Sequence, residues 1–171
     1  MINWQTEFRL WQSKVVVDVA AWQKEVERYV GRRVVLTNGC FDLIHFGHIE
    51  LLQAAKRKGN MLVVAVNSDQ SVRQLKGPER PLTPEAERLA VIAALESVDF
   101  CFIFHEKRCD QIIRAVRPDI WVKGGDYSVD KLDAGERAAA KEVGTTIEII
   151  PYVTGHSTTN IIARSKTAAA R

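Results

Sequence analysis

Apolar residues along this chain form two patterns, short runs typical of buried strands and spaced stripes typical of amphipathic helices. Five runs predict strands, at residues 33–37, 61–66, 100–104, 120–122 and 146–150, and the first of them is typical of a strand buried on both faces. The stretches between them predict helices at residues 47–58, 84–95, 109–116 and 131–143, with a last short helix starting at Ser157. Residues 68–82, after the second predicted strand, are polar and include glycine and proline, so a loop is predicted there. Thr83 is predicted to be the N-cap of the helix that follows, with Pro84 at its first position.

Strands and helices therefore alternate five times, which predicts an α/β fold. We expect a Rossmann-like five-stranded parallel sheet with helices on both faces. Right-handed crossovers bring the loops that follow the strands to one edge of such a sheet. Ligands bind at that edge, near the point where the strand order reverses.

The first thirty residues carry a different pattern, with large apolar side chains at steps of three and four. This stripe consists of Trp4, Phe8, Trp11, Val15, Val19, Trp22, Val26 and Tyr29. It predicts a helical extension over residues 1–30, formed by one helix or by two short helices in line, ahead of a main domain over 31–171. The stripe either packs on the core of that domain or forms the contact of a homodimer.

Composition narrows the class of protein. The chain has 171 residues, of which 46% are apolar and 26% charged, as expected of one soluble globular domain. The sequence contains no run of about 18 apolar residues and no secretory signal, so we expect neither a membrane span nor export. Three cysteines without a CxxC pair indicate reduced thiols in the cytoplasm. A net charge of +3 is too small to indicate nucleic acid, but suits a phosphorylated metabolite.

The segment TNGCFDLIHFGH, residues 37–48, leads from the first predicted strand into the next helix. Gly39 can adopt backbone angles closed to other residues, and Gly47 allows a ligand to approach closely. His45 and His48 can face one point at the helix N-terminus, where free N–H groups favour anions. They can then donate hydrogen bonds to phosphate oxygens. The glycine-rich dinucleotide fingerprint and the Walker phosphate loop are both absent, and no third ligand at a useful spacing supports zinc.

Three other segments follow predicted strands and carry phosphate-binding chemistry. Lys76 and Arg80, in LKGPERP, can clamp a second phosphate. In VKGGDY, Lys123 supplies a positive charge, and Asp126 can accept from a hydroxyl or assist a metal. The segment GHSTTNII, residues 155–162, offers hydroxyl and N–H groups at a helix start. The plain alternatives are a solvated basic loop, a glycine turn with surface charges and an ordinary N-cap.

Together these segments resemble the HxGH nucleotidyltransferase superfamily, and most of all the bacterial D-glycero-β-D-manno-heptose 1-phosphate adenylyltransferases. The resemblance spans about residues 30–163 and rests on TNGCFDLIHFGH, VNSD, LKGPERP, Arg88, PDIWVKGGDY and GHSTTNII. It implies transfer of AMP from ATP to heptose 1-phosphate with Mg²⁺, giving ADP-heptose and pyrophosphate for lipopolysaccharide core or other surface heptose synthesis. A sugar-phosphate oxygen would attack the α-phosphorus directly, without a covalent intermediate.

The resemblance also implies roles for individual residues. His45, His48 and Lys123 are expected to be catalytic. Nucleotide contacts are expected from Asn38, Gly39, Cys40, Phe41, Gly47, Arg88, Gly124, Gly125, Asp126, Ser157, Thr158 and Thr159. Acceptor contacts are expected from Asp42, Asn67, Lys76 and Arg80. The resemblance assigns no protein ligand to Mg²⁺, which is expected to enter with the ATP phosphates.

Two departures from related sequences shape the expected reaction. Many members carry a fused sugar kinase, for which 171 residues leave no room, so a separate heptose kinase is expected. The cytidylyl branch has an arginine shortly before the STT segment, whereas this chain has PYVTGH at 151–156, which favours adenine over cytosine. The alternatives are a cytidylyl- or adenylyltransferase acting on another phosphorylated alcohol, such as glycerol 3-phosphate, and a non-catalytic nucleotide-binding module.

Overall fold

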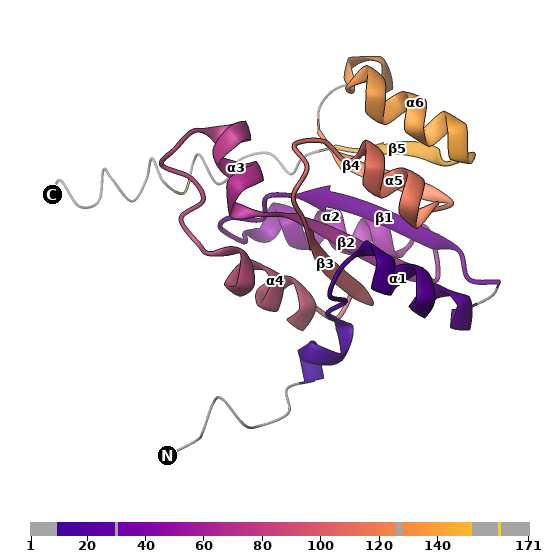
Figure 1. Ribbon diagram of the computed structural model, residues 1–171, viewed down its shortest axis with the longest axis horizontal. Helices are drawn as coiled ribbons and strands as arrows, with labels where there is room; N and C mark the ends of the chain where they lie inside the picture. The colour runs from indigo at the N-terminus through magenta and orange to yellow at the C-terminus, as the bar shows by residue number, and fades with distance from the viewer. Residues whose placement is uncertain (1–9, 30, 126–127, 152–160, 162–171) are drawn as a thin grey trace, which may run out of the picture.

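The structure, a computed structural model, describes residues 10–29, 31–125, 128–151 and 161 (Figure 1). Its strands are β1 (Val34–Gly39), β2 (Met61–Asn67), β3 (Phe100–Phe104), β4 (Ile120–Gly124) and β5 (Thr146–Ile150). Its α-helices are α1 (Val19–Val26), α2 (Phe46–Lys56), α3 (Asp69–Lys76), α4 (Glu85–Ala94), α5 (Asp110–Val116) and α6 (Ala134–Val143). Short 3-10 helices are η1 (Leu10–Lys14), η2 (Glu27–Tyr29) and η3 (Val129–Lys131). None of the helices within these ranges is long and apolar enough to cross a membrane.

The five strands form one parallel sheet in the order β3-β2-β1-β4-β5, which confirms the predicted fold class. From β1 the chain builds outward through β2 to β3, and it then returns to add β4 and β5 on the other side. The order therefore reverses between β1 and β4, which is where such folds bind ligands. At this seam the buried hydroxyl of Thr37 donates to the carbonyl oxygen of Val122 over 3.0 Å.

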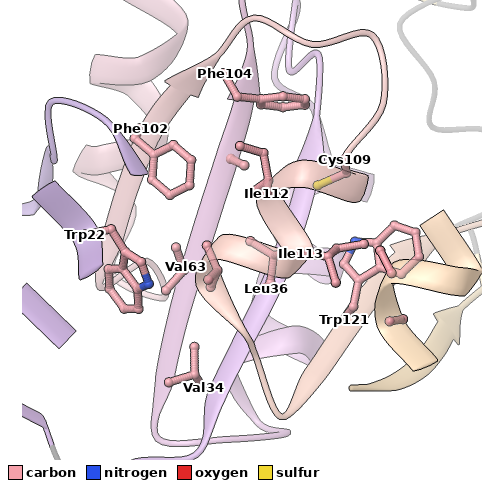
Figure 2. Close-up of a cluster of buried hydrophobic side chains, with 14 of the residues drawn as sticks. Trp22, Val34, Leu36, Val63, Phe102, Phe104, Cys109, Ile112, Ile113 and Trp121 are labelled. Carbon is pink, nitrogen blue, oxygen red and sulfur yellow. The ribbon is translucent and has the colours of Figure 1, made fainter. Parts of the chain in front are cut away.

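The side chains of the sheet alternate between two apolar clusters, as expected for a sheet that is covered on both faces. One cluster joins the sheet to α1, α5 and α6, and Figure 2 shows its centre, where Trp22, Phe102, Ile113 and Trp121 gather. The other joins the opposite face to α2 and α4, through residues such as Leu52. In Figure 1, α1 and α5 lie in front of the sheet and α2 lies behind it.

In the described part of the N-terminal stripe, η1 is separated by residues 15–18 from α1, which η2 follows directly. Val15 forms a parallel bridge with Cys101 of β3, and the Val16 N–H donates to the Cys101 carbonyl over 2.9 Å. Asp18 then caps α1. Trp22 is fully buried, with its ring centroid 5.4 Å from that of Phe100. This part of the stripe therefore packs on the domain core, as one of the two interpretations predicts. The stripe's first residues, Trp4 and Phe8, lie outside the described residues.

The predicted loop over 68–82 is wrong in its first half, which forms α3. The Ser68 side chain accepts from the Ser71 N–H over 3.2 Å and so starts the helix with a polar cap. Val72 is the one fully buried aliphatic side chain of α3, so the apolar stripe that normally predicts a helix is missing. Smaller corrections shift the next helix to an N-cap at Pro84 and split the predicted 131–143 helix into η3 and α6. Ser157, the expected cap of a last helix, lies outside the described residues.

Candidate active site

The carboxyl ends of β1 and β4 meet at the point where the strand order reverses, and two predicted site residues come together there. The Asn38 side-chain oxygen accepts from the Trp121 indole N–H over 3.1 Å and from the Lys123 ammonium over 3.3 Å. Asn38 and Lys123 are each the next-to-last residue of their strand, β1 and β4. The sheet itself therefore fixes the distance between them.

The two histidines of the HxGH segment lie at the start of α2 with their rings stacked. His45 is the N-cap residue, and its carbonyl oxygen accepts from the His48 N–H over 2.9 Å. The ring centroids are 3.8 Å apart and the ring planes differ by 27°. The Phe41 ring lies 5.3 Å from that of His48. Both imidazoles thus stand at a helix N-terminus, where backbone N–H groups favour an anion.

The environment of His48 keeps its ring neutral. Burial, and then the neighbouring His45, lower the pKa of His48 from 6.5 to about 4. The His48 Nδ1 atom is buried and has no hydrogen-bond partner in the part of the chain that the structure describes. Leaving a buried polar atom unpaired costs free energy, so a ligand that supplies the missing partner, or that raises the ring's pKa, is favoured here.

The backbone around Gly39 is shaped by the ring of Phe41. A Cβ atom built on Gly39 would lie 3.1 Å from Cε2 of Phe41, so a larger residue would displace that ring. Gly39 itself does not have a positive φ. Phe41 takes that conformation instead, with φ of 47°. Backbone strain of this kind gathers at functional sites, where packing holds it in place.

Asp42 and Arg80, both predicted to contact the acceptor, bind each other. Both the Nε and the Nη2 atoms of Arg80 contact one carboxylate oxygen of Asp42. The other oxygen accepts from the backbone N–H groups of Leu82 and Thr83, over 2.8 and 3.0 Å. Asp42 is 5% exposed, so this network ties the segment before α4 to the loop that follows β1.

Arg88, a predicted nucleotide ligand, is 1% exposed, and its guanidinium group donates hydrogen bonds to other groups of the protein. It donates to the carbonyl oxygen of Thr83 over 2.9 Å, to Asp69 over 2.8 Å and to the carbonyl oxygen of Cys40. These partners belong to three different segments, so Arg88 fixes the Cys40 backbone relative to the starts of α3 and α4. Asp69 is a partner that the sequence reasoning missed.

The other predicted site residues that the structure describes lie on several elements. Cys40 is partly buried, and burial raises the pKa of its thiol. At the end of β2, the Asn67 amide donates to the Ser71 hydroxyl over 2.8 Å. Lys76 is exposed at the end of α3. Gly47 lies in the first turn of α2, Gly124 ends β4, and Gly125 donates its N–H to the Ile150 carbonyl over 3.0 Å. Asp126, Ser157, Thr158 and Thr159 lie outside the described residues.

A hollow of about 290 Å³ opens beside the loop that follows β1. It is lined by Phe41, Asp42, Leu43, Ile44, Thr83, Arg88, Val91 and Ile161. Most of these side chains are apolar, and both polar anchors of the loop, Asp42 and Arg88, reach its wall. The hollow therefore shares Phe41 with the surroundings of His48.

Glu136 is a second residue that sequence reasoning missed. It lies in the first turn of α6, is 7% exposed, and has a carboxylate oxygen 4.0 Å from the Lys123 ammonium. An acidic residue in the first turn of a predicted helix is ordinary, because it complements the helix dipole. Only the tertiary packing of α6 against the end of β4 could have revealed it.

Comparison with known proteins agrees with this geometry. The model of the cytidylyltransferase-like family matches residues 36–164. The bifunctional protein HldE of Halorhodospira halophila is 50% identical over 137 residues, covering 80% of this chain and 28% of the relative. HldE of Geotalea uraniireducens is 47% identical over 155 residues, covering 88% of this chain and 30% of the relative. The chain thus spans less than a third of the length of these relatives.

Two solved structures have a similar fold. A lipopolysaccharide core biosynthesis protein from Thermoplasma volcanium is 33% identical with a TM-score of 0.60, covering 72% of this chain and 98% of its own. A pantoate–β-alanine ligase from Francisella tularensis has a TM-score of 0.56, covering 89% of this chain and 76% of its own; at 13% identity it shows the fold alone. The family match, the parallel sheet and the HxGH pair at its switch point agree, and the chain belongs to the cytidylyltransferase-like family of nucleotidyltransferases.

Proposed function

We propose that this protein transfers AMP from ATP to D-glycero-β-D-manno-heptose 1-phosphate, giving ADP-heptose and pyrophosphate. One observation carries the proposal: the stacked imidazoles of His45 and His48 stand at the N-terminus of α2, beside the point where the strand order reverses. Support for the sugar comes from the sequence resemblance, from the HldE relatives and from the lipopolysaccharide core protein of similar fold.

The proposed reaction needs positioning and charge stabilisation more than proton transfer. An oxygen of the sugar phosphate attacks the α-phosphorus of ATP, the bond to the bridging oxygen breaks, and pyrophosphate leaves with that electron pair. Because the nucleophile is already an anion, no strong base is required. The His45 and His48 rings would hold phosphate oxygens, and the Lys123 ammonium would reach them from the end of β4.

A divalent metal, Mg²⁺ in our proposal, would accompany the triphosphate and offset its charge. Mg²⁺ keeps several waters and binds through substrate phosphates with one or two carboxylates. Among the described residues, no three His, Cys, Asp or Glu side chains gather into a cage. Asp42 is already engaged by Arg80 and two backbone N–H groups. Asp126, the residue that could assist a metal, lies outside the described residues.

We also propose a cytoplasmic homodimer whose transferase domain spans residues 31–171, with residues 1–30 as a helical extension. The three unpaired thiols, Cys40, Cys101 and Cys109, suit a reducing compartment. The exposed apolar side chains of Phe46, Leu82 and Val91 suit a contact between subunits. Light scattering at micromolar concentration would overturn the dimer if it returned the mass of a monomer.

The decisive test of the reaction is pyrophosphate release from ATP and from CTP with a panel of phosphorylated acceptors. We expect turnover with ATP and heptose 1-phosphate, and formation of ADP-heptose by mass spectrometry. Activity with CTP and glycerol 3-phosphate, and none with heptose 1-phosphate, would replace this proposal with the cytidylyltransferase alternative. The chemistry of the acceptor also requires a preceding kinase reaction to install the 1-phosphate.

A further inference from the structure

Among the described residues, the Lys123 ammonium has three contacts, and the two to oxygen atoms are long. Its Nζ atom lies 3.3 Å from Asn38 Oδ1, 4.0 Å from Glu136 Oε2 and 4.9 Å from the centroid of the Trp121 ring. Other lysines of this protein pair more closely, with Lys56 2.5 Å from Asp99. Lys123 therefore has partners in the ligand-free protein but is not locked to any of them.

Glu136, in contrast, is firmly fixed. Its Oε1 atom accepts from the Cys109 backbone N–H over 2.9 Å, and its own N–H donates to the Asp133 side chain that caps α6. Burial raises the pKa of the adjoining Cys109 thiol, which stays neutral. A carboxylate that is 7% exposed needs a cation nearby, and Lys123 is its ion-pair partner within the described chain.

We propose that Glu136 is the resting counter-ion of Lys123. In the ligand-free protein it holds the ammonium at the edge of the site, and when phosphate binds the ammonium turns from Glu136 to the phosphate. The lysine moves because its contacts are long, whereas the carboxylate is fixed by α5 and α6. Glu136 is thus a positioning residue that acts through Lys123, and the inference rests on the site role proposed above for that lysine.

This arrangement has a measurable consequence for affinity. Because the ion pair must be given up when phosphate binds, it opposes binding, and removing it should tighten binding. Glu136→Gln keeps an oxygen for the Cys109 N–H but removes the charge that faces Lys123. We expect this variant to bind ATP and pyrophosphate about three- to tenfold more tightly in isothermal titration calorimetry. The KM for ATP should fall with it.

A purely structural role for Glu136 predicts the opposite. The variant would then melt at a lower temperature and bind both ligands as weakly as the wild type, or more weakly. Either result for affinity overturns the proposal. Glu136→Asp retains the charge but draws it back by one methylene, so we expect a smaller gain, and it serves as the second variant if the glutamine form does not fold. Glu142→Gln is the matched control, because Glu142 is exposed on the same helix and pairs with Arg114 over 2.8 Å.

A double-mutant cycle tests whether Glu136 acts through Lys123. Lys123→Met alone leaves a buried carboxylate unpaired and should lower the melting temperature, and adding Glu136→Gln should restore part of it. In the Lys123→Met background, Glu136→Gln should leave ATP affinity unchanged. A full affinity gain in that background would overturn the proposal. The calorimetry requires no heptose, so it remains decisive even if the acceptor proposed above is wrong.

Discussion

The loop that follows β1 and the last residues of β4 border the same candidate site, but their charged residues make different contacts. After β1, the Asp42 carboxylate is bound by Arg80 and by backbone N–H groups, and the buried Arg88 side chain donates to the Cys40 carbonyl oxygen. At the end of β4, the oxygen atoms that contact the Lys123 ammonium within the described residues lie at 3.3 and 4.0 Å, which are long contacts. The comparison indicates that charged side chains at one candidate site can be fixed by short contacts within the protein or held loosely, and that the lengths of their contacts distinguish the two cases.

The largest expected effect on activity comes from replacing His48, which follows β1 and is proposed to bind phosphate. We expect His48→Ala to lower turnover about 10²- to 10³-fold, because it removes one donor to the phosphates. Its melting temperature should stay level or rise, since the variant also removes a buried unpaired nitrogen. Steady-state kinetics and calorimetric melting measure the two. His105→Ala, at an exposed position, is the control, and a loss in His48→Ala no greater than the control's would refute a catalytic role.

Arg88→Met should show the opposite profile, because the scaffold is removed. Three partners in three segments lose a buried cation, so the free energy of unfolding should fall by about 3–5 kcal/mol in urea titration. Arg88→Lys should recover only part of this, since an ammonium cannot reproduce the guanidinium fork. Unchanged stability with a raised KM for ATP would instead restore Arg88 as a nucleotide ligand.

Asp42→Asn should have a smaller effect on stability than Arg88→Met. The amide oxygen can still accept from the N–H groups of Leu82 and Thr83, and only the charge paired with Arg80 is lost. We expect a loss of about 1–2 kcal/mol in the free energy of unfolding. Asp110→Asn, which breaks the more exposed pair with Arg114, is the control and should cost less than about 1 kcal/mol. Equal losses would show that burial of Asp42 adds nothing.

The smallest expected effect is on pH dependence. The pKa of His48 is lowered from 6.5 to about 4 in the folded protein, so between these values the unfolded chain binds more protons. Stability should therefore be complete above pH 6.5 and should decline as the pH falls toward about 4. Urea titrations across this range should show a shallower decline in His48→Gln. Identical slopes in the two proteins would mean that His48 titrates normally.

Strand positions were predictable because each strand contains a short, mostly apolar run. The run that contains Leu62, Val63 and Val64 is buried on both faces of the sheet, and this needs no tertiary information to recognise. The helix α3 was not predictable in this way, because its start depends on the Ser68 cap and its buried face includes Ser71.

The candidate site likewise has features that follow from local sequence and features that depend on tertiary packing. The position of His45 and His48 between a buried strand and a helix N-terminus follows from local sequence, and the structure stacks their rings there. The partners of Arg88 and Lys123 come from Asp69 and Glu136, which lie 19 and 13 positions away and meet them only through packing. Local sequence therefore predicts where the candidate site residues lie along the chain, whereas their contact partners could be found only from the tertiary structure.

The bridge between Val15 and Cys101 has a consequence for how the protein behaves in solution. An outer strand with unpaired backbone groups is a template for another chain, and β3 is one of the two outer strands of this sheet. Here the chain's own N-terminal segment occupies part of that edge, with the Val16 N–H donating to Cys101. Removing or displacing the chain near residue 15 would expose the edge of β3, and we expect the folded molecules then to aggregate through this edge.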